Sequence, residues 1–169
     1  MTNKERLEAN NAKIAQIQET LKNKILAVVG EKEIEVELPE EFDDVANVYY
    51  FKITEEKMLF SGDNSGMGLW LYRIKEKSWK QVSSLYANWS MCFIFGDHCL
   101  ISGNHNNSGI LCYDITSDEV EQIYDSGLHW SSAKSVGDRI LIFSSTTSGI
   151  LSYDITNRTI KKIYDSGSY

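Results

Sequence analysis

Few side chains in this sequence stand in a pattern that catalysis would need. The run GDNSG at residues 62–66 holds a serine that a nucleophilic mechanism could use. The matching places in two later repeats read GNHNNSG and SSTTSG, so this serine belongs to a variable turn. The three histidines, His98, His105 and His129, have neither the HExxH pattern nor another spacing typical of paired metal ligands. The sequence therefore predicts no catalytic residue, no metal site and no cofactor.

The three cysteines, Cys92, Cys99 and Cys112, fit a protein with reduced thiols. Their number is odd, and the N-terminus lacks the apolar segment of a secretory signal peptide, so we expect synthesis in the cytoplasm. Cys112 aligns with Ser152 in the repeat described below. This exchange predicts a small side chain that fills a core.

The net charge of the 169-residue chain is −7, and its lysines and arginines form no cluster. Binding to nucleic acid draws much of its affinity from clustered cations that displace counterions, so we expect no nucleic-acid partner. No stretch approaches the ~20 apolar residues of a membrane-spanning helix, and we expect no membrane partner.

One segment of the chain occurs twice with little change. SGILCYDITSDEVEQIYDSG, Ser108–Gly127, returns as SGILSYDITNRTIKKIYDSG, Ser148–Gly167, with 13 of 20 positions identical. A more divergent copy precedes them, in which Tyr72 aligns with Tyr113 at an offset of 41 residues. The stretch 48–169 is therefore predicted to hold three β repeats of ~40 residues, at about 48–88, 89–129 and 130–169.

Each repeat reads as four short strands, and the third repeat is the model for the others. Ala133–Val136 is followed by a Gly137-Asp138 turn and RILIFS, and then by ILSYDI, a TNRT turn and IKKIYD. Asp114 and Asp154 each precede a turn, so their carboxylates are expected to accept hydrogen bonds from its backbone amides. Four-stranded sheets that repeat at ~40 residues are typical of propeller blades.

The segment GLWLYRIKEKSWKQV carries Tyr72 and Trp79 at the places where kelch blades have tyrosine and tryptophan. In this the repeats resemble kelch and related β-propeller blades, although only Ser61-Gly62 and Ser102-Gly103 stand near the kelch Gly-Gly pair. The resemblance implies a mainly β, propeller-like architecture and no particular activity. Three blades do not close a ring, so several chains could complete one, or the chain could be part of a longer array. A β-trefoil, which closes with three four-stranded units, is the alternative.

The segment that precedes the repeats is predicted to begin with a helix over residues 1–30. Leu7, Ile14, Leu21 and Val28 fall seven residues apart, as in a coiled coil, which predicts self-association through residues 1–28. Residues 31–47 read as an acidic connector with a short strand, because apolar side chains alternate there with glutamates at Ile34, Val36 and Leu38.

The opening MTNKERLEANNAKIAQIQETL is similar to the start of tail-associated structural proteins from phages and prophages of Gram-positive bacteria. The resemblance implies a non-enzymatic structural or adhesion protein, associated with a virion, whose helix oligomerises or attaches it. The alternative is a binding module of non-phage origin, such as a trefoil-type lectin or a scaffold β-propeller.

The predicted ligand-binding residues gather at one end of the repeats, in the loops that follow the second and fourth strands. These loops vary between repeats and carry aromatic and amide side chains, which suit a protein or carbohydrate ligand. The residues are Asp63, Asn64, Trp89, Asn104, His105, Asn106, His129 and Trp130. Because Trp89 and Trp130 recur at one place in the repeat, packing between repeats is the other interpretation for both.

Overall fold

The computed structural model describes most of the chain outside its N-terminal segment and the loops on one side of the repeats. The described residues are 12–13, 24–29, 32–62, 67–85, 89–103, 109–125, 130–144 and 149–165. The chain divides into two compact units, Met1–Val45 and Ala46–Tyr169. Within the described residues, no helix has the length and apolar character needed to cross a membrane.

The first unit contains a two-stranded antiparallel hairpin, β1 (Lys24–Val29) and β2 (Lys32–Glu37), followed by a 3-10 turn, η1 (Glu40–Phe42). The helix predicted over residues 1–30 is wrong for Lys24–Val29. That sequence, KILAVV, is rich in β-branched residues, and its backbone pairs with β2 in register from Lys24 opposite Glu37 to Val29 opposite Lys32. Residues 12–13 are helical, and the other residues of the predicted helix lie outside the described ones.

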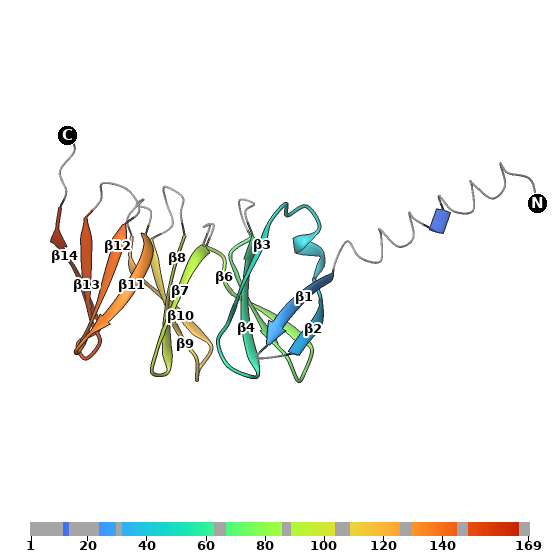
Figure 1. Ribbon diagram of the computed structural model, residues 1–169, viewed down its shortest axis with the longest axis horizontal. Coiled ribbons are helices and arrows are strands. Elements are labelled where there is room, and N and C mark those ends of the chain that lie inside the picture. The colour runs from blue at the N-terminus through green and yellow to red at the C-terminus, as the bar shows by residue number, and fades with distance from the viewer. Residues whose placement is uncertain are drawn as a thin grey trace, which may run out of the picture. The chain divides into compact units, whose positions relative to one another are not determined.

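The second unit consists of three antiparallel four-stranded sheets, each with its strands in chain order (Figure 1). Sheet 1 comprises β3 (Val48–Lys52), β4 (Lys57–Gly62), β5 (Leu69–Arg73) and β6 (Ser78–Ser83). Sheet 2 comprises β7 (Trp89–Phe95), β8 (His98–Gly103), β9 (Ile110–Asp114) and β10 (Glu119–Tyr124). Sheet 3 comprises β11 (Trp130–Val136), β12 (Arg139–Ser144), β13 (Ile150–Asp154) and β14 (Thr159–Tyr164).

The three sheets repeat one register, which confirms the alignment of the repeats. Tyr72, Tyr113 and Tyr153 all lie in the third strand of their sheet, and each is paired with a residue of the second strand. All three side chains are buried, with exposed fractions of 5%, 0% and 2%. The repeated strings in the sequence therefore specify equivalent positions in a scaffold.

The sheets stack face to face because alternate side chains of the middle sheet point in opposite directions. Cys99, Ile101 and Tyr113 form one buried cluster with the leucines of β4 and β5 in sheet 1. Leu100 and Cys112, which alternate with them, pack in a second cluster with residues of sheet 3. Sheet 2 is thus covered on both faces, and burial of these apolar side chains holds the stack together.

This arrangement of separate, stacked four-stranded meanders is propeller-like. In the described residues, every strand pairing of the second unit lies within one sheet. The trefoil alternative is therefore not the fold of this chain.

Candidate functional site

The structure describes few of the predicted ligand-binding residues. Asp63, Asn64, Asn104, His105, Asn106 and His129 lie outside the described residues, and Trp89 is the first residue of β7. Trp130, the first residue of β11, has a fully buried side chain in the cluster between sheets 2 and 3. Its indole packs edge-on against Tyr124, with ring centroids 5.9 Å apart. Trp130 thus packs between repeats in this structure, and its side chain is not exposed to a ligand.

The opposite end of the stack, where the short turns lie, contains a cluster of charged residues between sheets 1 and 2. At this first junction, Asp118 in the β9–β10 turn has an exposed fraction of only 9%. Lys57 Nζ lies 2.6 Å from its Oδ1, and Arg73 pairs with its Oδ2. The Tyr113 hydroxyl also donates to Oδ1, at 2.6 Å. The carboxylate therefore joins strands of both sheets.

These contacts fix the charge of Asp118. Burial alone would raise the pKa of this carboxyl, but hydrogen bonds from Lys57, Tyr113 and Arg73 bring it down to about 2. The pKa of Tyr113 is raised, first by burial and then by donation to the carboxylate. The first junction therefore contains an ionised carboxylate whose charge is balanced, and whose oxygens are hydrogen-bonded, by neighbouring side chains.

At the second junction, between sheets 2 and 3, equivalent positions carry different charges. His98 and Asp114 are paired across β8 and β9 in the same way as Lys57 and Arg73 are across β4 and β5. Arg158 takes the place of Asp118 before the last strand of its sheet. Arg158 Nη2 lies 2.9 Å from His98 Nε2, which in turn lies 3.4 Å from Asp114 Oδ2.

The contact between Arg158 and His98 is a hydrogen bond in which the guanidinium donates, because a guanidinium cannot accept. The same Nε2 of His98 also faces the Asp114 carboxylate, so the imidazole lies between a cation and an anion. Arg158 forms no ion pair within the described part of the chain, in contrast to Asp118 at the first junction.

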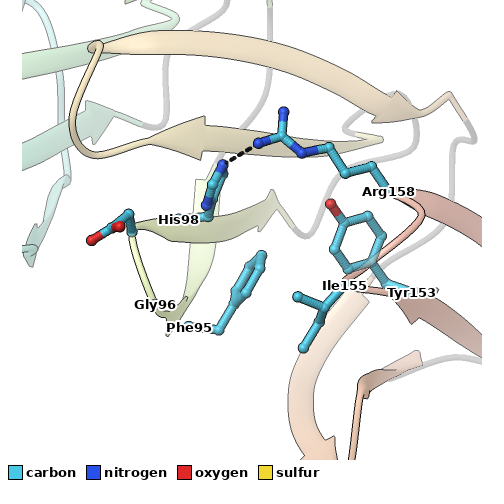
Figure 2. Close-up of a pocket in the computed structure, with 7 residues that line it drawn as sticks. Phe95, Gly96, His98, Tyr153, Ile155 and Arg158 are labelled. Atoms are coloured by element: carbon cyan, nitrogen blue, oxygen red, sulfur yellow. Dashed lines mark hydrogen bonds between the residues drawn. The ribbon is translucent and has the colours of Figure 1, made fainter.

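A cavity of about 230 Å³ opens beside this contact. Figure 2 shows His98 and Arg158 on its wall, with Phe95 and Gly96 from the β7–β8 hairpin and Tyr153 and Ile155 from sheet 3. We call it the apolar cavity; the residues that line it are Phe95, Gly96, Asp97, His98, Tyr153, Ile155 and Arg158. The Phe95 ring stacks on His98 and meets the edge of Tyr153, with centroids 5.8 and 5.9 Å away.

A second cavity, of about 280 Å³, shares His98, Tyr153 and Arg158 with the first. We call it the acidic cavity; it is lined by His98, Cys112, Asp114, Glu119, Val120, Glu121, Tyr153 and Arg158. The backbone amides of Ser117 and Thr116 lower the pKa of Asp114 and keep it ionised. The prediction that the Asp114 carboxylate accepts hydrogen bonds from the backbone amides of its turn is confirmed. The amide nitrogens of Thr116 and Ser117 both lie within 3.0 Å of its Oδ1.

Two of the titratable groups that line the cavities, Cys112 and Tyr153, are uncharged at neutral pH. Burial raises the pKa of the Cys112 thiol, which leaves it protonated and weakly nucleophilic. The pKa of Tyr153 is raised to about 12, mainly by burial, so the phenol stays neutral. In the described part of the chain, no three His, Cys, Asp or Glu side chains are grouped to hold a metal ion.

The cavities lie at the turn end of the stack, whereas the sequence pointed to the loop end. The signal that could have found them is a break in the repetition. Aligned repeats place Lys57, His98 and Arg139 at one position and Arg73, Asp114 and Asp154 at its partner. A change of charge at an equivalent position of the repeat indicates that one junction between sheets differs from the next.

Comparison with known proteins supports the fold. No family model and no curated protein matches the chain. The solved structure of TolB from Acinetobacter baumannii is similar over 86% of this chain, with 18% identity and a TM-score of 0.51. The N-terminal domain of Nup159 matches over 68%, with 12% identity and a TM-score of 0.43. The chain spans 38% of the length of TolB and 32% of that of Nup159. The TolB similarity agrees with the propeller-like fold seen in the three sheets.

Proposed function

We propose that this chain is a non-enzymatic binding module. The stacked sheets form its scaffold, and the second junction binds a partner protein. The observation that carries the proposal is the difference between two equivalent junctions. At the first, Lys57 and Arg73 close on Asp118; at the second, two adjoining cavities surround Arg158.

The chemistry of the second junction favours a protein ligand. Ligand sites combine apolar and aromatic walls with a few polar groups that fix orientation. Phe95, Ile155 and Tyr153 supply such walls, and the charged groups lie at their border. Aromatic and arginine side chains are also the residues enriched in protein interfaces.

The more specific assignments stay predictions. They are a phage or prophage tail role, adhesion to a glycan, and self-association through residues 1–28. Glycan-array binding by the full chain would favour the lectin alternative, and turnover of any panel substrate would contradict a non-enzymatic role.

The proposal is tested by capturing partners from an extract of the source organism on the immobilised full chain. A retained protein is then purified, and its dissociation constant is measured by isothermal titration calorimetry. The informative variant is Ile155→Ala, which removes one wall of the apolar cavity. Its matched control is Ile115→Ala, at the equivalent turn of sheet 2, where the side chain packs against the first cluster.

Both substitutions truncate a half-buried isoleucine at equivalent turns, so they should lower the free energy of unfolding to a similar extent. We expect Ile155→Ala to weaken binding at least fivefold and Ile115→Ala to leave it unchanged. Equal effects of the two variants, or no specifically retained protein, would overturn the proposal.

A further inference from the structure

We infer that the acidic cavity receives a lysine or arginine side chain of the partner. This inference rests on the proposed function and names the chemistry that the site recognises. It follows from the balance of charges at the second junction.

The carboxylates of the acidic cavity come from one sheet. Asp114, Glu119 and Glu121 all belong to β9 and β10, or to their ends, in sheet 2. Glu119 and Glu121 are exposed and form no ion pair with the described residues. Three negative charges therefore line a space that has one permanent cation, Arg158.

Of these acids, Glu119 and Glu121 are peculiar to sheet 2, whereas Asp114 has an equivalent in Asp154 of sheet 3. The register places Lys80 of sheet 1 and Lys161 of sheet 3 at the position of Glu121. The position of Glu119 is held by a serine in sheet 1 and a threonine in sheet 3. The scaffold thus has no need of carboxylates at these positions.

The first junction shows how the same positions are used when they serve the scaffold. Its cations converge on the sheet-2 turn, with Lys57 and Arg73 on the Asp118 carboxylate and Lys80 Nζ 3.5 Å from the Asp118 backbone oxygen. At the second junction, the guanidinium of Arg158 contacts His98 and forms no ion pair with the described residues. Asp114 faces His98, whereas Glu119 and Glu121 have no ion-pair partner among the described residues and are available to a cation of the partner.

The spacing of the carboxylates suits an organic cation. The carboxylates are not grouped closely enough to hold a metal ion, since no such cluster occurs in the described part of the chain. An ammonium or guanidinium group can instead bridge spaced carboxylates through several N–H donors. The long stem of a lysine or arginine can lie along Val120 and Tyr153, which line the same cavity. The net charge of −7 would also attract a basic partner.

The test is an NMR titration of the ¹⁵N-labelled full chain with Nα-acetyl-lysine methylamide. Nα-acetyl-norleucine methylamide is the uncharged control, because it keeps the aliphatic stem and lacks the ammonium. We expect saturable shifts of the backbone amides of Asp114, Glu119 and Glu121 with the lysine probe. The norleucine probe should leave them unchanged, and salt should weaken the lysine effect.

The decisive variant carries Glu119→Gln and Glu121→Gln, which remove both exposed charges and keep the side-chain shape. We expect its dissociation constant for the lysine probe to rise at least fivefold. The matched control, Glu55→Gln with Glu76→Gln, makes the same change of net charge at exposed positions in sheet 1 and should bind as the parent does. This control separates the local effect from the general field of the protein.

Three results would overturn the inference: equal shifts with norleucine, unchanged binding in the Glu119/Glu121 variant, or tighter binding of Nα-acetyl-glutamate methylamide. The last would make Arg158 the anchor for an acidic ligand. If Ile155→Ala weakens the binding of a captured partner but Glu119→Gln and Glu121→Gln do not, the proposed function stands. Only the inference that the acidic cavity binds a basic side chain is then overturned.

Discussion

Asp118 and Arg158 occupy the same position in consecutive sheets and carry opposite charges. Each is the last residue before the fourth strand, and each has a positive φ, 58° for Asp118 and 51° for Arg158. Asp118 pairs with Lys57 and Arg73 of the preceding sheet, whereas Arg158 contacts His98 of the preceding sheet. The backbone of the turn is therefore constant, while the side chain decides whether the junction is closed by ion pairs or left open.

The closed junction predicts a large difference between two matched substitutions. Asp118→Asn removes the buried charge that Lys57 and Arg73 neutralise, and we expect it to lower the free energy of unfolding by about 3 kcal/mol. Arg158→Asn, at the equivalent exposed position, should cost less than about 1 kcal/mol. Asparagine tolerates a positive φ, so neither change strains the turn. Urea unfolding of both variants measures the difference, and equal losses would contradict it.

Acid stability should report the same carboxyl. The pKa of Asp118 is about 2 in the folded chain, against about 3.9 in an unfolded one. A depressed pKa contributes stability that is complete above the unfolded value and is lost as the pH falls from about 4 to about 2. We expect the free energy of unfolding to decline by about 2 kcal/mol more in the parent than in Asp118→Asn over this range. Parallel pH curves for the two proteins would exclude this role.

The glycine before the third strand of each sheet should be intolerant of a side chain. Gly149 has a φ of +99°, and a Cβ there would lie 1.9 Å from the backbone oxygen of Tyr164. Gly137 also has a positive φ, +62°, but a Cβ there would meet no atom within 4 Å. Gly137→Ala should therefore cost only the backbone strain, about 1 kcal/mol, and Gly149→Ala at least about 2 kcal/mol more. Thermal unfolding of both variants compares the strain with the clash.

The repeats could be predicted because their signals are local. Strand alternation and turns such as Gly137-Asp138 predicted strands close to β11–β14, and the recurrent tyrosine fixed the alignment of the sheets. The strand β1 was missed because KILAVV suits both a heptad and a β-strand, and pairing with β2 decides between them. Local propensity alone does not settle such a segment.

The two junctions could not be predicted in the same way. The ion pair of Lys57 with Asp118 joins residues 61 positions apart, and its existence depends on how two sheets stack. The cavities depend on the same stacking, because their walls come from sheets 2 and 3. The changes of charge between aligned repeats, such as aspartate for arginine at positions 118 and 158, were visible in the sequence, but their meaning needed the geometry of both junctions.

The three thiols should differ in reactivity. Cys99 is fully buried, and hydrogen bonding to Cys92 together with burial raises its pKa. Cys92 is only partly buried. We expect iodoacetamide to label Cys92 before Cys99 in the native protein, because the reactive species is an accessible thiolate. Mass spectrometry of peptides from a timed reaction gives the order, and a guanidinium-unfolded sample, in which all three should react, is the control.

A charge exchange at the first junction tests whether its side chains act as a pair. Arg73→Asp and Asp118→Arg each place like charges together, next to Asp118 in the first variant and next to Lys57 in the second. Combined, they exchange the two charges of the Arg73–Asp118 ion pair and so restore one pair of opposite charges at these positions. We expect the double variant to be more stable than the sum of the single losses by about 1–3 kcal/mol, which is the usual range for residues in contact. Unfolding experiments on the four proteins of this cycle give the coupling energy. Additive losses would mean that Arg73 and Asp118 stabilise the stack independently, and the charge reversal between Asp118 and Arg158 would then have no role in matching the sheets.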